Sequence, residues 1–299
     1  MDQPTLRLLS LGAGVQSTTL ALLCVEGSLD RLDGAIFADT GWEPHAVYQQ
    51  VDNLDSLLTG VGIPLYRVSN GNIRTDAIDV AHRYASLPYF VRNGDGSEGL
   101  GRRQCTHEYK LAPINRKVRE LLGASPPKFR TVPNGKIAEQ WIGFSTDEIG
   151  RVNNKRGVRY LSPRYPLIEL GMSRRDCERF LKSRGWGDTQ KSACIGCPFH
   201  GNKQWRDMRD SRPDEWNDAV AFDQAIRKGG ARGIPLRGEA FLHRSLMPLD
   251  VAPVDRITRS EMKSWQVDLF DDSDLDLLEY GDPDGCSPYG CRSGSPGGG

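Results

Sequence analysis

Short apolar runs alternate with amphipathic segments through the first third of the chain, and this alternation constrains the fold more than any other feature. The strands it predicts cover residues 5–11, 34–39 and 63–69, and the helices cover 16–26, 44–62 and 72–85. Strand–helix alternation predicts a parallel, twisted sheet with right-handed crossovers and helices on both faces. We therefore expect an α/β protein.

The later segments extend this pattern and then change character. A polar, glycine-rich stretch at 92–104 is expected to form a mobile loop or lid. Further predicted elements are a strand at 136–145, helices at 105–123, 173–186 and 212–230, and a helix after the cysteine turn at 194–197. The expected organisation is a nucleotide-binding α/β domain over 1–170, a helical extension over 171–269, and a disordered acidic, then Gly/Ser-rich tail over 270–299.

Composition narrows the class of protein. The 299 residues carry 39 basic and 39 acidic side chains, so bulk charge does not indicate a nucleic-acid or membrane-surface binder, although a local basic face remains open. No apolar run approaches the roughly 18 residues of a membrane span, and the N-terminus lacks the apolar segment of a signal peptide. We expect a cytoplasmic protein with no membrane partner. Seven cysteines in such a chain favour metal or redox chemistry over disulfides.

The segment SLGAGVQST joins the first strand to the first helix. Gly12 and Gly14 permit a tight turn, and the helix N-terminus offers N–H groups and a positive dipole end to an anion. Ser17 and Thr18 add hydroxyls. No Walker phosphate loop is present, and the fit to a Rossmann dinucleotide turn is a near miss that ends in serine. The alternative is a purely structural glycine turn.

Four motifs in sequence order resemble the adenine-nucleotide alpha-hydrolase (PP-loop ATPase) superfamily, in its phosphoadenosine phosphosulfate (PAPS) reductase-like branch. They are SLGAGVQST, FADTGWEP, IGFSTDEIGR and YPLIELGMSRRDCERFL, and the likeness spans most of residues 7–225. Against the common loop S-G-G-x-D-S, Gly14 is retained, whereas Gly12, Ala13 and Gln16 stand where Ser, Gly and Asp are usual. The resemblance implies a HUP/PP-loop type of sheet that binds ATP with Mg²⁺.

The resemblance also implies a set of nucleotide-binding residues. These are Gly12, Ala13, Gly14, Gln16, Ser17, Thr18, Asp39, Thr40, Gly143 and Arg151. Asp39 ends the second predicted strand, where ligands of such sheets gather, so we expect a catalytic, ribose or metal contact there. The alternative for Asp39 is an ordinary turn residue at the strand end.

Three cysteines are candidate metal ligands. Cys194 and Cys197 form a C-x-x-C turn with glycine inside, which lets two thiolates converge on one metal, although such a pair is also compatible with redox chemistry. Cys105 joins them by resemblance, because RRQCT followed by CPF recurs in PAPS reductase-like proteins. Three thiolates can hold a [4Fe–4S] cluster, or they can bind Zn²⁺ with a fourth ligand such as His200 or His107. We favour the cluster.

The function expected from these features is ATP-dependent adenylation with loss of pyrophosphate, followed by sulfur insertion, as in a sulfurtransferase. Cys105, Cys194, Cys197 and Asp39 are the expected catalytic residues. Expected partners are a nucleotide, a sulfur donor (sulfide or a cysteine desulfurase product), and a nucleic-acid or small-molecule acceptor; a homodimer stays open. Alternatives are a zinc-containing ligase that uses ammonia, a sulfonucleotide reductase, and a nucleotide sensor without turnover.

Overall fold

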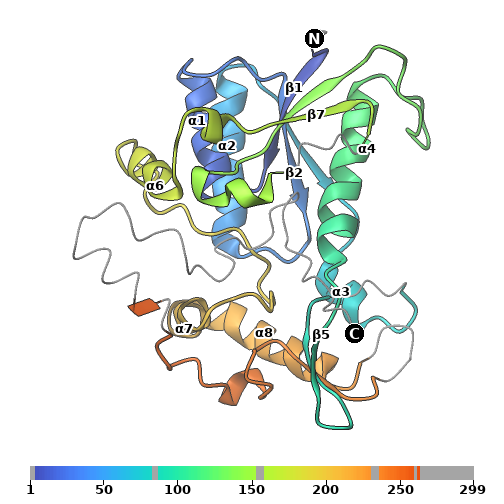
Figure 1. Ribbon diagram of the computed structural model, residues 1–299, viewed down its shortest axis with the longest axis vertical. Helices are drawn as coiled ribbons and strands as arrows, with labels where there is room; N and C mark the ends of the chain where they lie inside the picture. The colour runs from blue at the N-terminus through green and yellow to red at the C-terminus, as the bar shows by residue number, and fades with distance from the viewer. Residues whose placement is uncertain (1–3, 83–86, 153–157, 230–235, 259–260, 263–299) are drawn as a thin grey trace.

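A five-stranded parallel sheet forms the centre of the upper lobe (Figure 1). The computed structural model describes residues 4–82, 87–152, 158–229, 236–258 and 261–262. The strands lie in the order β3-β2-β1-β6-β7, and every neighbouring pair is parallel. Their bounds are β1 (Leu6–Leu11), β2 (Gly34–Asp39), β3 (Leu65–Ser69), β6 (Ala138–Trp141) and β7 (Leu161–Arg164). The expected α/β class with a parallel sheet is confirmed.

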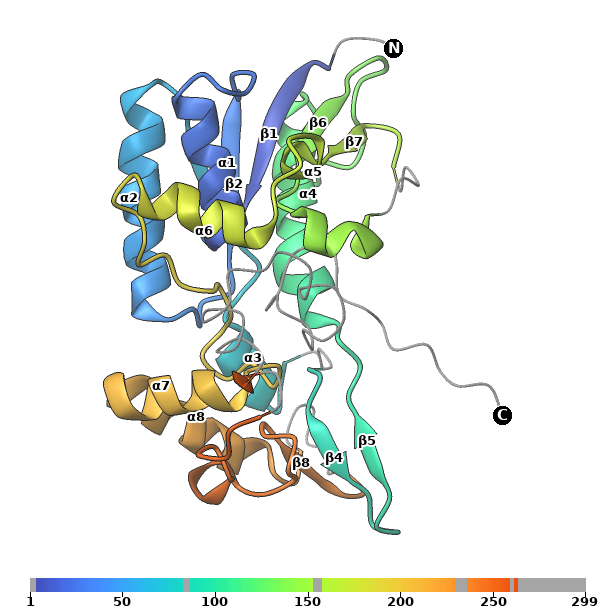
Figure 2. The ribbon, with the colours of Figure 1, turned by 60° about the vertical axis from the view of Figure 1, so that its left-hand side comes forward.

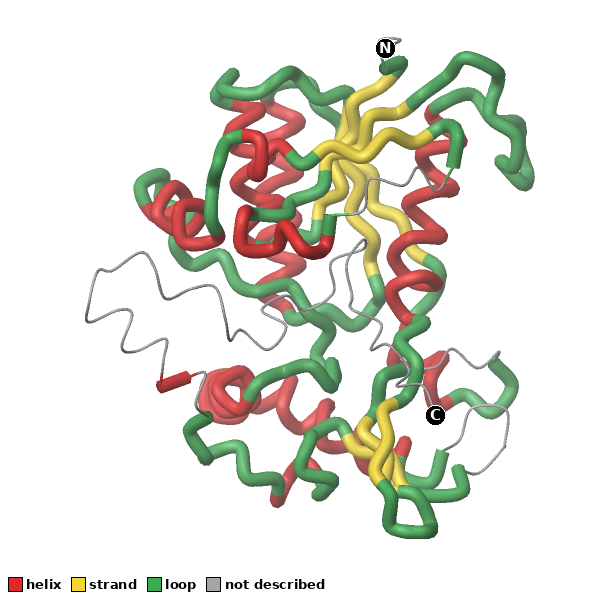
Figure 3. Tube along the Cα trace, in the orientation of Figure 1, coloured by secondary structure: helices red, strands yellow, loops and turns green. Residues whose placement is uncertain are grey.

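Helices cover both faces of this sheet, which explains the continuous apolar runs of the central strands. One face packs against α1 (Val15–Val25), α2 (His45–Gly60) and α6 (Arg174–Lys182), and the other against α4 (Ala112–Leu121). Figure 3 shows the yellow strands between the two sets of red helices. Helix α1 is buried along almost its whole length because α2 and α6 both lie against it (Figure 2).

The strand order contains a switch in direction beside β1. From β1 the chain moves outward to β2 and β3, and it then returns to β6 on the other side of β1. In open parallel sheets, the crevice at the carboxyl ends of two strands separated in this way is where ligands bind. The turns that follow β1 and β6 therefore occupy the position at which this fold favours a ligand.

A lower lobe carries a second, antiparallel sheet that the sequence pattern did not predict. Its strands lie in the order β5-β4-β8, with bounds Phe90–Arg92 for β4, Glu98–Leu100 for β5 and Glu239–Phe241 for β8. The stretch at 92–104 thus contains the turn and second strand of a β-hairpin, and the expectation of a loop is wrong for residues 98–100. The helices of this lobe are α3 (Ile73–Ile78), α7 (Asn202–Ser211) and α8 (Pro213–Ile226).

One further element begins where the sequence predicts, and others differ in extent from the prediction or were not predicted. Ser173 caps α6 in a capping box with Asp176, as its serine predicted. The helix expected at 72–85 ends at Ile78, and the helix expected at 105–123 begins as a π-helix, η1 (Thr106–Leu111), before α4. Short helices are η2 (Thr146–Arg151), α5 (Pro166–Glu169) and η4 (Leu249–Val251), and strand β7 was not predicted.

The packing of α6 bears on the organisation expected from sequence. Cys177 and Leu181 of α6 share one hydrophobic core with α1 and β1, so this helix packs with the sheet although it follows residue 170. The tail expected at 270–299 lies outside the described residues. Among the described residues, no helix combines the length and apolar character needed to cross a bilayer.

Candidate functional site

The glycine turn between β1 and α1 is built around the hydroxyl of Ser17. The N–H of Gly12 donates a 3.2 Å hydrogen bond to Ser17 Oγ, which in turn donates to the carbonyl of Gly14 at 3.3 Å. Ala13 has φ of 56°, in the left-handed region that favours glycine. Within the described part of the chain, no side chain caps α1 at Gly14. The first amides of the helix are therefore available to an anion.

A second segment closes on this turn from the neighbouring strand β6. A β-carbon on Gly143 would lie 3.0 Å from the backbone nitrogen of Ser17, so only glycine fits there without a shift. Gln16 Nε2 donates a 3.1 Å hydrogen bond to Oε2 of the buried Glu148, whose other oxygen pairs with Arg151. Residues that the sequence placed in two separate motifs thus meet at the switch point of the sheet.

Asp39 lies at the end of β2 and is already engaged by neighbouring groups. Its Oδ1 accepts hydrogen bonds from the N–H of Gly41 at 2.7 Å and from the hydroxyl of Tyr48 at 2.8 Å. Burial, together with the bond to Asp39, raises the pKa of Tyr48 well above its usual range, so this hydroxyl stays protonated. The sequence analysis did not single out Tyr48. These contacts serve the turn at the strand end, which was the alternative reading for Asp39.

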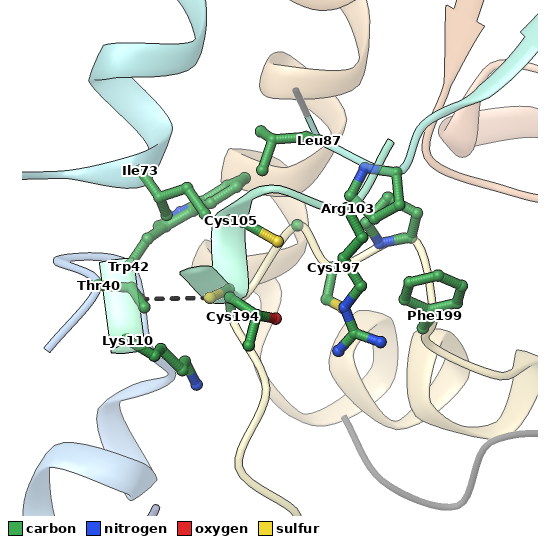
Figure 4. Close-up of a pocket in the computed structure, with 14 residues that line it drawn as sticks. Thr40, Trp42, Ile73, Leu87, Arg103, Cys105, Lys110, Cys194, Cys197 and Phe199 are labelled. Atoms are coloured by element: carbon green, nitrogen blue, oxygen red, sulfur yellow. Dashed lines mark hydrogen bonds between the residues drawn. The ribbon is translucent and has the colours of Figure 1, made fainter. Parts of the chain in front are cut away.

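Cys105, Cys194 and Cys197 line one pocket below the carboxyl end of β2 (Figure 4). The space between its lining atoms, with the open solvent at its mouth included, is about 450 Å³. The other lining residues are Thr40, Trp42, Ile73, Leu87, Pro88, Arg103, Thr106, Lys110, Gly196, Pro198 and Phe199. Residues from five parts of the chain (40–42, 73, 87–88, 103–110 and 194–199), including the expected ligands, are therefore brought together; we call this the cysteine pocket.

The close approach of the C-x-x-C turn to Trp42 shapes this pocket. The N–H of Cys197 bonds to the carbonyl of Cys194 at 3.0 Å, and the N–H of Ile195 bonds to the carbonyl of Trp42 at 2.9 Å. A β-carbon on Gly196 would lie 2.0 Å from Cη2 of the Trp42 ring. Glycine inside the turn is thus required by the indole and not only by the bend of the backbone.

Charged groups lie beside the thiol of Cys194. Lys110 Nζ is 3.5 Å from Glu43 Oε1, and both side chains are buried. The same Glu43 oxygen accepts from Thr40 Oγ1 at 3.0 Å and lies 3.7 Å from Cys194 Sγ. Thr40 Oγ1 is also 3.2 Å from Cys194 Sγ, the dashed line in Figure 4. Thr40, which was expected at the nucleotide, therefore contacts Cys194 in this structure.

Glu43 and Phe199 belong to this site although the sequence analysis did not select them. Glu43 Oε2 is buried without a hydrogen-bond partner in the described structure. The guanidinium of Arg103 lies over the ring of Phe199, 4.7 Å from its centroid, at the edge of the pocket. Glu43 lies inside the motif FADTGWEP and Phe199 inside CPF, so their position next to the strand end and to the C-x-x-C turn was the available signal.

The donor set of the cysteine pocket can be tested against the expected metal. All five described cysteines are thiols and not disulfides, and Cys24 and Cys177 are buried in the core of the upper lobe. Nowhere in the described ranges are three or more histidine, cysteine or carboxylate side chains already arranged around one point to hold an ion. The chemistry of three thiols in one pocket nevertheless fits a three-cysteine cluster, whose ligation would replace the contacts of Cys194 Sγ with Thr40 and Glu43.

The two histidines considered as a fourth ligand do not line the pocket as described. His107 is exposed. His200 is buried, and Nε2 lies 3.0 Å from the carbonyl of Cys194. Burial lowers the pKa of His200 to about 4, so the ring is neutral at pH 7 and Nε2 carries the hydrogen that bonds this carbonyl. His200 supports the C-x-x-C turn through the backbone, which fits a three-thiol donor set better than tetrahedral zinc.

One segment connects the glycine turn with the cysteine pocket. A β-carbon on Gly14 would lie 3.6 Å from the backbone nitrogen of Ser192, two residues before Cys194. Gln50 Nε2 bonds to both Thr189 Oγ1, at 3.1 Å, and Thr18 Oγ1, at 3.4 Å. The segment 189–197 therefore runs from the helix N-terminus of α1 directly to the cysteines, and the two sites are neighbours.

Neither the family models nor the curated proteins compared with this chain match it. The fold and the site themselves define its class. It is an α/β protein with a glycine turn at the switch point of a parallel sheet and a buried three-cysteine pocket beside that turn.

Proposed function

We propose that this protein is an ATP-dependent adenylating enzyme that releases pyrophosphate and inserts sulfur into its acceptor, with Cys105, Cys194 and Cys197 holding a [4Fe–4S] cluster. One observation carries the proposal. Three cysteines from two distant segments line a single pocket, and the segment 189–197 joins that pocket to the glycine turn. Because the nucleotide site and the thiolate site are neighbours, one acceptor can be adenylated on its oxygen and then attacked by sulfur at the carbon that carries this oxygen.

The glycine turn supplies the first step. The amides at the start of α1 and Ser17 bind the phosphates of ATP, with Mg²⁺ neutralising their charge. An oxygen of the acceptor attacks the α-phosphorus, a P–O bond forms, and pyrophosphate leaves. Gly143 leaves room for the turn to keep its shape, and the Glu148–Arg151 pair fixes Gln16 within it. These residues bind and orient the nucleotide, and none of them is oxidised or reduced in this step.

The cysteine pocket supplies the second step. Cys105, Cys194 and Cys197 would hold the cluster, which would supply hydrosulfide as a nucleophile beside the activated acceptor. Overall, hydrosulfide forms a C–S bond to the activated carbon, the C–O bond breaks, and AMP leaves with the oxygen, so no oxidant is needed. Arg103 and Lys110 add positive charge for the anions, and the side chains of Trp42, Ile73 and Leu87 limit the access of water.

Metal analysis of protein purified without oxygen tests the proposal. We expect brown protein with about four iron atoms per chain for one cluster, and pyrophosphate release from ATP in the presence of acceptor. Cys197→Ala is expected to lose the iron while it still binds ATP. Cys177→Ala is the matched control, because this thiol is also buried but lies on α6, and it should keep the iron.

The remaining outcomes separate the alternatives. A colourless protein that contains zinc indicates the ligase that uses ammonia, and iron retained in full by Cys197→Ala rules out this ligand set. Ser17→Ala should weaken ATP binding about 10-fold, because it removes the hydroxyl that holds Gly12 and the turn. An unchanged affinity of that variant in calorimetry contradicts the role of the glycine turn.

A further inference from the structure

A second hollow lies at the N-terminus of α1, between α6 and the segment that follows it. It encloses about 910 Å³, part of it open to solvent. Val15, the first residue of α1 after the glycine turn, lines it together with Trp186 and Thr189. Its charged lining residues all come from α6 and are Arg174, Arg175, Glu178, Arg179 and Lys182. We call it the α6 hollow.

Cations outnumber carboxylates among the side chains that line this hollow, on a chain whose total charge is zero. Its lining residues include four cationic side chains and one carboxylate. Arg175, Arg179 and Lys182 have the spacing i, i+4, i+7, which places them in a row along one side of a helix. Arg174 pairs with Glu178 at 3.0 Å and Arg179 pairs with Asp176, so two of the four cations already have a carboxylate partner within α6.

Helix α6 is fixed firmly enough for these cations to keep their positions relative to the glycine turn. Its inner face buries Cys177 and Leu181 in the core shared with α1. Its first turn is held by the capping box at Ser173 and by Asp147, whose Oδ2 accepts from the N–H of Arg174 at 2.7 Å. Burial raises the pKa of Cys177 to about 12, so this anchor remains an uncharged thiol.

We infer that the α6 hollow is a second phosphate site, which binds a phosphate monoester or diester carried by the acceptor substrate. Arginine guanidinium groups match phosphate oxygens in pairs, and lysine adds a point charge. The row from Arg175 to Lys182 is about 10 Å long at 1.5 Å per residue, which is more than one phosphate occupies. This inference rests on the proposed function for its acceptor, but the binding site itself does not need the metal.

The location gives the hollow a specific use. Thr189 lines it, and the segment 189–197 continues past the glycine turn to Cys194. A phosphate held in the α6 hollow would therefore anchor one end of an acceptor whose reacting oxygen lies at the α-phosphate of ATP. The phosphate group can belong to a small phosphorylated molecule or to the backbone of a nucleic acid. The experiment below distinguishes these two ligands.

The test compares Arg179→Gln/Lys182→Gln with wild type, using the full-length protein. The matched control is Lys203→Gln/Arg209→Gln, which removes two cations from α7 instead. Three probes are titrated without metal loading: AMP, a fluorescent single-stranded 12-nucleotide oligomer, and ATP with Mg²⁺. A poly-glutamate peptide serves as an anion without phosphate. Circular dichroism and thermal unfolding establish that each variant is folded.

We expect the α6 variant to lose at least 10-fold in affinity for AMP or for the oligomer, and less than 2-fold for ATP. If the oligomer is the ligand, the slope of log K against log salt should fall by about 1.4, from two lost phosphate contacts. A loss for AMP as well as for the oligomer indicates a terminal or small phosphate ester. A loss for the oligomer alone indicates a nucleic-acid backbone.

Three results overturn the inference. These are equal affinities in wild type and the α6 variant, an equal loss in the α7 control, and binding of poly-glutamate as tight as that of the oligomer. A loss of ATP affinity as large as that of the probes would assign the hollow to the nucleotide site and would also overturn it. Because no probe reports sulfur insertion, failure of the proposed function leaves these binding results unaffected, and the reverse also holds.

Discussion

Gln16 Nε2 donates a 3.1 Å hydrogen bond to Glu148 Oε2, and this bond joins the glycine turn after β1 to a residue 132 positions later in the chain. Glu148 is 5% exposed, and its other oxygen accepts from Arg151. In the resembling loops an aspartate is usual at the position of Gln16. Here the side chain is used within the protein, where it ties the turn to the segment after β6.

This bond predicts an energetic coupling between the two motifs. Glu148→Ala should lower the free energy of unfolding by about 3 kcal/mol, because it removes the carboxylate that pairs with the mostly buried Arg151. Gln16→Ala should cost about 1–2 kcal/mol, the usual contribution of a hydrogen bond to a charged group. Urea unfolding of the two single variants and the double variant measures the coupling. Effects that add to within about 0.5 kcal/mol would contradict it.

The close approach of Gly143 to Ser17 predicts a loss of nucleotide binding in Gly143→Ala. The added β-carbon would lie 3.0 Å from the Ser17 nitrogen and 3.2 Å from the carbonyl carbon of Gln16, so the turn must shift. We expect at least a 10-fold loss of ATP affinity in calorimetry. Gly150→Ala is the control, because a β-carbon there meets nothing within 4 Å. Equal affinities in the two variants would disprove the link between this contact and the nucleotide.

The close approach of Gly196 to Trp42 predicts that an added β-carbon at this position would disturb the cysteine pocket. The Trp42 ring cannot easily yield to a new β-carbon, since its Nε1 bonds Asp218 at 2.6 Å and its ring lies 4.5 Å from that of Phe222. Gly196→Ala should lower the free energy of unfolding by about 1–3 kcal/mol. Iron content per chain should also fall. Gly201→Ala, with no atom within 4 Å of its added β-carbon, should change neither.

His243 predicts a loss of stability at acid pH. Its Nδ1 accepts from the N–H of Ser245 at 3.1 Å, and Nε2 lies 3.0 Å from Asn202 Oδ1, so the buried ring is neutral. Burial lowers the pKa of His243 to about 4, below the ordinary 6.5 of the unfolded chain. As the pH falls, the unfolded chain binds this proton first, and stability is lost between about pH 6.5 and 4.

The expected loss from this one group between pH 7 and pH 5 is about 2 kcal/mol. Urea unfolding at the two pH values measures it. His243→Gln should be less stable at pH 7 and yet lose less between pH 7 and pH 5. It will keep part of the slope, because the pKa of His200 is lowered in the same direction. A variant with the same pH slope as wild type would refute the assignment.

Local sequence was sufficient for the elements whose signals are local. The apolar runs gave β1 and β2, since strands covered by helices on both sides must be apolar throughout. Ser173 predicted the start of α6, because a capping box involves only residues close together in the sequence. Strand β7 was missed because it has the sequence LSPR, in which neither apolar alternation nor a continuous apolar run is present.

The lower lobe and the site contacts depended on residues far apart in the chain. β4 pairs with β8 across about 150 positions, and each strand has three residues, too few for a periodic signal. A contact between distant residues also escaped prediction at Thr40, which was assigned to the nucleotide as part of a strand-end motif. Only the packed structure shows that its hydroxyl lies beside Cys194.

The sequence by itself determined the parallel α/β sheet, the glycine turn at its edge and the identity of the three thiols, because periodicity, caps and short motifs act over a few residues. The tertiary structure decided what those pieces do together: it put Cys105 in one pocket with Cys194 and Cys197, and it set four cations of α6 beside the glycine turn. These arrangements follow from burial of surfaces that meet only when distant segments pack, and no local pattern encodes that meeting.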